Sequence, residues 1–166
     1  MTFYIYFTKR NAFISNCIAI ATGSKVSHTG ILAGNTCYEA RGDGKYRSVI
    51  SQSFTEMLKD KDLTGVWLKK IEVDDEKEAL KWLKSRLGYK YDFINTVVIQ
   101  PIKILTGWLV GQKKDNVADN RYMCGEYSAD WLKSNWKEKK RITEPIASYA
   151  PNNLFDLIQP WEYDLK

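Results

Sequence analysis

Short runs of β-forming residues, separated by turn residues, fill the first half of the chain and predict a sheet. Five strands are expected, over residues 2–7, 28–33, 36–41, 46–50 and 66–73. Only Gly34-Asn35 separates the second run from the third, which fits a two-residue hairpin turn. The runs therefore predict a mostly antiparallel sheet.

Helical spacing of apolar residues becomes prominent in the second half of the chain. Helices are expected over residues 11–22, which Gly23 follows, and over 93–105, 123–136 and 151–157. Ser53-x-x-Glu56 is a capping box and predicts the start of a short helix. Because strands gather in the first half and helices in the second, the expected class is α+β, an antiparallel sheet packed against helices.

A further amphipathic helix is expected to begin at Asp74. Its apolar positions Leu80, Leu83 and Leu87 share one helical face, and Gly88 marks its end. No internal repeat and no Pro/Gly-rich linker divides the sequence. The 166 residues, 44% of them hydrophobic, suit one globular domain over 1–166.

Histidine and cysteine usage excludes several classes of site. The sequence has one histidine, so zinc sites built on two or three histidines are ruled out. The three cysteines form no CxxC pair and have no zinc-ligand spacing, so we expect no structural metal site. An odd, low cysteine count is typical of reduced thiols, and no signal peptide is recognised, so a cytoplasmic protein is expected. A phage-encoded protein, or one exported without a signal peptide, is the alternative.

The net charge of +5 favours anionic partners without identifying one. Much of it lies in short runs, at Lys69-Lys70, Lys113-Lys114 and residues 137–141. The last run is interpreted as a solvated helix end, and no nucleic acid is expected as a partner. The apolar segment 93–110 is interrupted by Pro101 and Lys103, which argues against a membrane span and leaves contact with a membrane surface as an alternative.

His28 begins the second predicted strand. Whether its imidazole can act as a base depends on which side chains of the next strand lie beside it. With a two-residue turn at Gly34-Asn35, His28 lies opposite Arg41 and shares a face with Glu39. A carboxylate there would hold one imidazole nitrogen and leave the other to act as a base. A three-residue turn would send Glu39 to the other face, and a lone histidine is more often structural.

The three cysteines stand in different settings. Cys17 lies within a predicted helix among isoleucines, and Cys37 lies within a strand, so both suit packed thiols. Cys124 falls in the first turn of the helix predicted over 123–136, where free N–H groups and the helix dipole stabilise a thiolate. The alternative is a small packed thiol at a helix entry. The inward positions of that helix are expected to be Tyr127, Ser128, Trp131 and Leu132.

Five short motifs occur in an order that resembles a known family. They are Ser27-His28-Thr29-Gly30-Ile31, Tyr38-Glu39-Ala40, Gly88-Tyr89-Lys90-Tyr91-Asp92-Phe93, Tyr122-Met123-Cys124-Gly125-Glu126 and Tyr149-Ala150-Pro151-Asn152-Asn153-Leu154. Together they resemble the circularly permuted NlpC-type papain-like cysteine hydrolases, a group of small bacterial and phage proteins distantly related to the lecithin:retinol acyltransferase family. In the permuted branch the histidine strand precedes the cysteine helix, as it does here.

The resemblance implies a thiol hydrolase, a cysteine peptidase or amidase with a papain-like fold. Cys124 would be the nucleophile, His28 the general base and acid, and Glu39 the residue that orients the imidazole. Glu126 would support the site, and Asp92 matches the Tyr-Asp pair of the family, although it also suits a helix N-cap. The candidates for a hydroxyl that assists the oxyanion are Tyr6, Tyr38, Tyr91 and Tyr122.

The reaction that the resemblance implies is acyl transfer through a thioester, which requires no metal and no organic cofactor. The expected substrate is a peptide or an acylated amide, and peptidoglycan-derived peptides are included. Gly125 and Thr29 depart from the family, where Ser and Val are common, and leave the substrate pocket open. One alternative is an acyltransferase or lipid amide or ester hydrolase, since the segment 93–110 would accommodate an acyl chain. Another is a binding module that has lost turnover. The sequence does not indicate an oligomeric state.

Overall fold

The structure is a computed structural model that describes residues 1–11, 25–42, 46–92, 120–158 and 163–164. Its strands are β1 (Phe3–Arg10), β2 (His28–Ala33), β3 (Thr36–Arg41), β4 (Ser48–Ser53), β5 (Leu63–Ile71), β6 (Lys90–Tyr91), β7 (Arg121–Tyr122) and β8 (Tyr163–Asp164). Its α-helices are α2 (Phe54–Leu58), α3 (Glu76–Ser85), α5 (Cys124–Asn135) and α6 (Pro151–Leu157), joined by the 3-10 turns η3 (Lys139–Arg141) and η4 (Ile146–Ser148). The helices predicted over 11–22 and 93–105 lie almost wholly outside the described residues.

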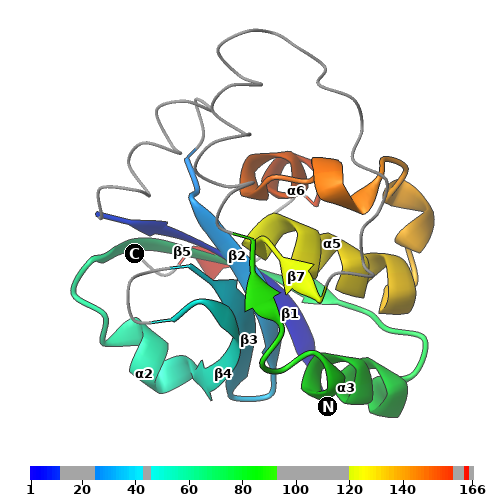
Figure 1. Ribbon diagram of the computed structural model, residues 1–166, viewed down its shortest axis with the longest axis horizontal. Coiled ribbons are helices and arrows are strands. Elements are labelled where there is room, and N and C mark those ends of the chain that lie inside the picture. The colour runs from blue at the N-terminus through cyan, green and yellow to red at the C-terminus, as the bar shows by residue number, and fades with distance from the viewer. Residues whose placement is uncertain (12–24, 43–45, 93–119, 159–162, 165–166) are drawn as a thin grey trace, which may run out of the picture.

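The strands form one open sheet in the order β7-β6-β4-β3-β2-β1-β5-β8 (Figure 1). Neighbouring strands are antiparallel except β6 and β7, which are parallel within the described part of the chain. Sequence neighbours β2, β3 and β4 pair in succession, and β1 is inserted between β2 and β5. The protein is therefore α+β with a mostly antiparallel sheet, as predicted.

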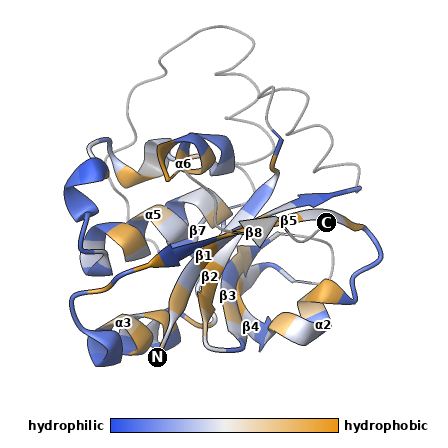
Figure 2. Ribbon diagram, turned by 180° about the vertical axis from the view of Figure 1, so that it is seen from behind, coloured by the Kyte–Doolittle hydropathy of each residue, from blue (hydrophilic) through white to orange (hydrophobic). Residues whose placement is uncertain are grey.

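Helices cover both faces of the sheet (Figures 1 and 2). One face packs against α3, α5 and α6, and the other packs against α2. Strand β1 shows how alternation divides the two cores: Phe3, Ile5 and Phe7 join the first, and Tyr6 joins the second. Each core is built from side chains of every second position along the central strands.

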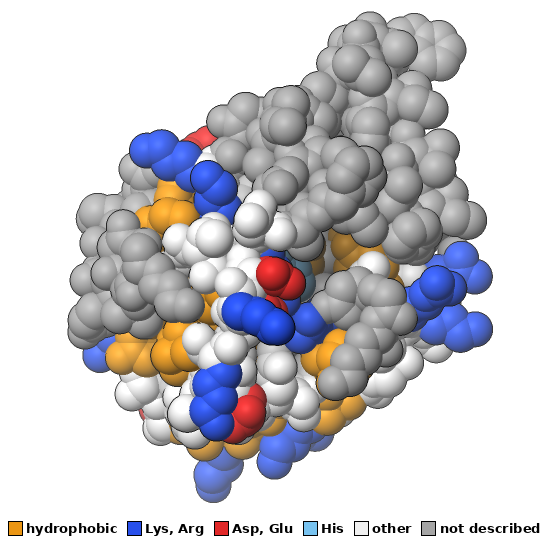
Figure 3. Space-filling model, turned by 90° about the vertical axis from the view of Figure 1, so that its left-hand side faces the viewer, with side chains coloured by type: hydrophobic (Ala, Val, Ile, Leu, Met, Phe, Trp, Pro, Cys, Tyr) orange, Lys and Arg blue, Asp and Glu red, His pale blue; other side chains and the backbone are white. Residues whose placement is uncertain are grey.

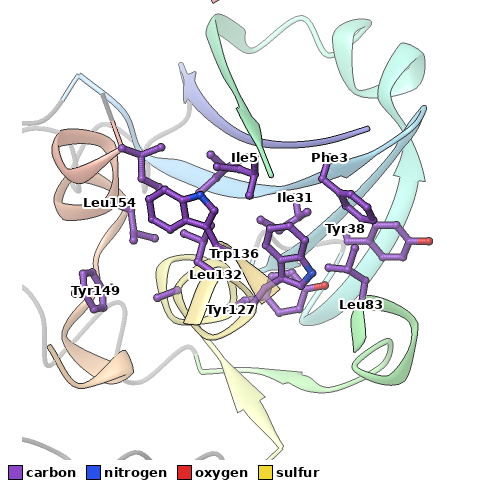
Figure 4. Close-up of a cluster of buried hydrophobic side chains, with 14 of the residues drawn as sticks. Phe3, Ile5, Ile31, Tyr38, Leu83, Tyr127, Leu132, Trp136, Tyr149 and Leu154 are labelled. Carbon is purple, nitrogen blue, oxygen red and sulfur yellow. The ribbon is translucent and has the colours of Figure 1, made fainter. Parts of the chain in front are cut away.

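Helix α5 is the central helix of the first core (Figure 4). The positions predicted to point inward, Tyr127, Ser128, Trp131 and Leu132, are all 0% exposed. The indole N–H of Trp131 donates to the Ala79 carbonyl at 3.2 Å, which ties α5 to α3. A large apolar side chain buried in this way contributes roughly 1.5–3 kcal/mol. The helix that begins at Cys124 is thus held firmly against the sheet.

Two predicted helix starts need correction. Helix α3 begins at Glu76, two residues after the predicted start at Asp74, because Asp75 caps it by accepting hydrogen bonds from the Lys77 and Glu78 N–H groups, at 2.7 and 3.1 Å. Leu87 lies beyond the end of this helix and is 40% exposed, so it was wrongly placed on the buried face.

The capping box predicted at Ser53 is also wrong, although Ser53 does precede α2. The Ser53 side chain forms no capping hydrogen bond, and its hydroxyl lies 3.4 Å from the Asn35 amide nitrogen. The hairpin turn brings Asn35 to this helix end, where its carbonyl accepts from the Phe54 N–H at 2.9 Å. Ser53 also ends β4, which spans Ser48–Ser53 rather than the predicted 46–50.

Candidate functional site

His28 and Glu39 meet across the hairpin of β2 and β3. Ala33 pairs with Thr36, which is the register of a two-residue turn, and Gly34 adopts φ 62° in that turn. The register brings both side chains to the same face of the sheet, and the imidazole Nε2 is hydrogen-bonded to Glu39 Oε2. The predicted pairing of these two residues is confirmed.

Glu39 is a fully buried carboxylate with several charged and polar neighbours. Gln52 of β4 donates from Nε2 to Glu39 Oε1, and Arg41 Nη1 lies 3.8 Å from the same oxygen. Burial by itself raises the pKa of the Glu39 carboxyl, but the charge and hydrogen bond of His28, followed by the charges of Arg41 and Arg10, lower it to about 2. The carboxylate is therefore ionised throughout the neutral range.

Cys124 is the first residue of α5, as predicted, and two contacts fix this end of the helix. The Thr29 hydroxyl donates to the Tyr6 carbonyl at 2.9 Å and lies 3.4 Å from the Ser128 hydroxyl, which joins β2 to α5. A Cβ atom at Gly125 would lie 2.1 Å from the Tyr149 carbonyl oxygen. Glycine at 125 therefore allows the segment before α6 to close against the helix start.

The Cys124 thiol lies close enough to the His28 imidazole to contribute to its raised pKa. Burial by itself lowers the pKa of His28, but the charge of Glu39 and the interactions with Cys124 raise it to about 9. Because Nε2 is held by Glu39, Nδ1 is the ring nitrogen left for proton transfer. The His28 side chain is 14% exposed and Cys124 7%, so the pair lies in a largely dry setting.

Cys37 differs from Cys124 although it lies on the same face of the sheet as His28. It is fully buried, and its sulfur lies 3.9 Å from the Met57 sulfur. Burial, and next the charge of Glu39, raise the pKa of the Cys37 thiol far above its ordinary value. This is a packed thiol. Cys17 lies outside the described residues.

Glu126 and Tyr122 have defined partners near the start of α5. The Glu126 carboxylate is buried and accepts from the Met123 N–H at 2.8 Å, so it caps the helix that carries Cys124. The Tyr122 hydroxyl donates to Asp130 Oδ2 at 2.7 Å within the first core. The hydroxyl proton of Tyr122 is therefore donated to Asp130, which argues against Tyr122 as a donor to the oxyanion.

The other tyrosines and Asp92 lie around this centre in different ways. Tyr38 belongs to the first core and thus to the sheet face opposite Glu39. The Tyr91 ring lies against Gly42, where a Cβ atom would be 2.2 Å from the ring. The Asp92 N–H donates to the Tyr122 carbonyl at 3.0 Å, and the helix that Asp92 was expected to cap lies outside the described residues.

Gln52 and Arg41 were not predicted as members of the site. Arg41 was expected opposite His28. It follows Glu39 by two residues on the same strand, so the two side chains share a face, and this spacing could have indicated that Arg41 belongs to the site. Gln52 reaches Glu39 from the next strand, where Cys37 pairs with Gln52 and Glu39 with Ile50. The segment that joins β3 to β4 contains Gly42, Asp43 and Gly44, and turns of several lengths suit it, so the β3–β4 register does not follow from the sequence.

Basic side chains do not gather into one patch on the face shown in Figure 3, where several lie beside acidic ones. In the run 137–141, Lys137 pairs with Glu72 at 3.1 Å and Lys139 with Asp74 at 2.7 Å. Arg141 pairs with its neighbour Glu138 at 3.1 Å. The run follows α5 and ties it to the end of β5, so its charge is largely compensated locally.

The described ranges have the features of neither a metal site nor a membrane span. No group of three His, Cys, Asp or Glu side chains there is arranged to hold a metal ion. None of the helices in those ranges combines the length and the apolar character that a membrane span requires. The segment 93–110, considered above for acyl-chain binding, lies outside them.

Comparison with known proteins adds no family. The sequence matches no protein-family model, and it has no significant match among curated proteins.

Proposed function

We propose that the chain is a cysteine hydrolase of the permuted papain-like type, with Cys124 as nucleophile, His28 as proton carrier and Glu39 as the orienting carboxylate. The observation that carries this proposal is that one imidazole both interacts with the Cys124 thiol and is hydrogen-bonded to the buried Glu39 carboxylate. Cysteine nucleophiles require an adjacent base, held in turn by a third group. A thiol that serves only in packing requires neither an adjacent base nor a carboxylate that orients the base.

The proposed reaction cleaves an amide in two steps. The Cys124 sulfur attacks the carbonyl carbon, the C–N bond breaks, and His28 delivers its proton to the departing amine. Water then attacks the thioester, His28 takes a proton from that water, and the acid product leaves with the thiol restored. The N–H groups at the start of α5 favour the charge that develops on the carbonyl oxygen.

The substrate class that we favour is a peptide or isopeptide amide, including peptides derived from bacterial cell walls. Activity should be sought on muropeptides and on acylated amines in parallel, with release of amine and carboxylate measured by mass spectrometry. We expect cleavage of the peptide amides and a covalent acyl adduct on Cys124. Cleavage of lipid amides alone would instead favour the acyl-chain alternative.

Cys124→Ser and His28→Ala test the assignment of the two reacting groups. Each should abolish turnover while circular dichroism stays unchanged, because neither side chain forms part of the apolar packing between sheet and helices. Turnover that survives either substitution would contradict the proposal.

A further inference from the structure

The side chain of Tyr6, on strand β1, extends across strand β2 toward Glu39. Tyr6 pairs with Gly30 in the β1–β2 register. A Cβ atom at Gly30 would lie 2.5 Å from the Tyr6 hydroxyl oxygen and 2.7 Å from the ring carbon that carries it. Only glycine at position 30 lets the Tyr6 ring cross β2 toward β3.

The far end of that ring lies beside the carboxylate. Extending the β2–β3 register by one pair from Ile31 and Tyr38 places Glu39 opposite Gly30, so Tyr6, Gly30 and Glu39 form one row across three strands. Tyr6 is 0% exposed, and its hydroxyl forms no hydrogen bond of full geometry with any described residue. The charge of Glu39 acts on it: burial raises the pKa of Tyr6 most, and Glu39 raises it further.

A buried hydroxyl turns its proton toward a nearby anion in preference to a weak acceptor such as the Cys37 sulfur. The ionised carboxylate of Glu39 can only accept hydrogen bonds, and its two oxygens have room for more donors than His28 and Gln52 supply. The other groups that face it are Arg41 on its own strand, Arg10 on β1, and the uncharged Cys37 thiol. A neutral donor adds a directional contact to this cluster without changing its net charge.

We propose that Tyr6 is a positioning residue for the site, whose hydroxyl donates toward Glu39 and thereby fixes the carboxylate that orients His28. This role rests on the proposed function for its consequence in catalysis, but the contact itself can be tested without a substrate. Its action is indirect, because Tyr6 touches neither the thiol nor a reacting carbonyl in the row described. Gly30 is part of the same arrangement, because the absence of a side chain there leaves space for the Tyr6 ring.

The test is a nuclear magnetic resonance titration of Tyr6→Phe, with Tyr4→Phe as the matched control two residues along β1. Loss of the hydroxyl should move the Glu39 carboxyl midpoint upward by about 0.5–1 pH unit, because the charged carboxylate loses a donor. The exchange of the His28 Nε2 proton with water should also become about tenfold faster at neutral pH. A structural role alone would leave both unchanged. An unmoved Glu39 midpoint in folded Tyr6→Phe, or an equal shift in Tyr4→Phe, would overturn the proposal.

Gly30→Ala approaches the same contact from the other side. Its methyl group would also lie 2.8 Å from the Tyr38 carbonyl oxygen, so this variant loses stability as well. The informative quantity is the Glu39 midpoint, which should rise in Gly30→Ala and should not rise further when Gly30→Ala is added to Tyr6→Phe. Additive shifts would show that the two positions act separately, against the proposal. If the proposed hydrolase activity is absent, these titrations still decide the contact.

Discussion

Glu39, which is fully buried, is hydrogen-bonded to Nε2 of His28, whose side chain is 14% exposed. An ion pair in this setting keeps both partners charged, because each compensates the other for lost hydration. The imidazole is thereby held in one orientation, which leaves its other nitrogen for proton transfer with the Cys124 thiol.

The first prediction concerns the protonation of His28, which is readily followed because it is the only histidine in the sequence. Its ring resonances should titrate with a pKa of about 9, against an ordinary value of 6.5. Glu39→Gln removes the largest favourable contribution to the imidazolium, so the pKa should fall by more than one unit. Glu72→Gln, on the exposed pair with Lys137, is the control and should leave it unchanged.

Folding stability should follow the same two groups. The raised pKa of His28 stabilises the fold below about pH 6.5, and this contribution is lost as the pH rises through about 9. The lowered pKa of Glu39 stabilises it above about pH 4.5, and this is lost as the pH falls toward 2. Urea unfolding should thus give a maximum between these limits that is flattened in Glu39→Gln, and an unflattened curve would contradict the pairing.

Glu39→Gln should reduce turnover less than His28→Ala does. The histidine transfers protons, a role worth about 10²–10⁴-fold, whereas the carboxylate only holds the ring. The measurement is kcat/KM across pH on a cleaved peptide amide. Its alkaline limb should lie near pH 9 in the parent protein and at lower pH in Glu39→Gln. An equal loss in both variants would show that Glu39 takes part in the chemistry itself.

Gly125→Ala should destabilise the docking of the α5 start. The added methyl group would lie 2.1 Å from the Tyr149 carbonyl oxygen, a backbone atom that cannot simply rotate away. We expect a loss of about 1–3 kcal/mol in the free energy of unfolding, as for other overpacked sites. Lys133→Ala, on the exposed side of the same helix, should change it by less than about 0.5 kcal/mol. An equal loss of unfolding free energy in the two variants would show that Gly125 is not needed for the packing of the helix start.

Tyr122→Phe distinguishes a structural tyrosine from an oxyanion donor. It leaves the buried Asp130 carboxylate without its 2.7 Å donor, which should lower the free energy of unfolding by about 1–3 kcal/mol. Turnover per folded molecule should stay unchanged. A selective loss of kcat with normal stability would return Tyr122 to the reaction centre.

Much of the site could be predicted because its key contacts are local in sequence. The turn at Gly34-Asn35 fixed the register of β2 and β3, and with it the shared face of His28 and Glu39. The bounds of α5 followed from apolar spacing, which placed Cys124 in its first turn. Short-range rules sufficed wherever a turn or a helix end set the geometry.

The remaining contacts depend on pairings between distant segments. Gln52 reaches Glu39 only through the β3–β4 register, and Tyr6 only because β1 inserts between β2 and β5. The failed capping box at Ser53 has the same origin, since the hairpin delivers Asn35 to that helix end. Local sequence patterns do not indicate which distant residue lies next to a given side chain in the fold.

Alkylation of the cysteines by iodoacetamide at pH 7, read by peptide mass spectrometry, tests the central claim most directly. Cys124 should react faster than Cys37, whose buried thiol serves as the internal control, and His28→Ala should slow Cys124 to the level of an ordinary thiol. Equal reaction of Cys124 and Cys37, or a Cys124 rate that is unchanged in His28→Ala, would contradict an imidazole-activated thiol.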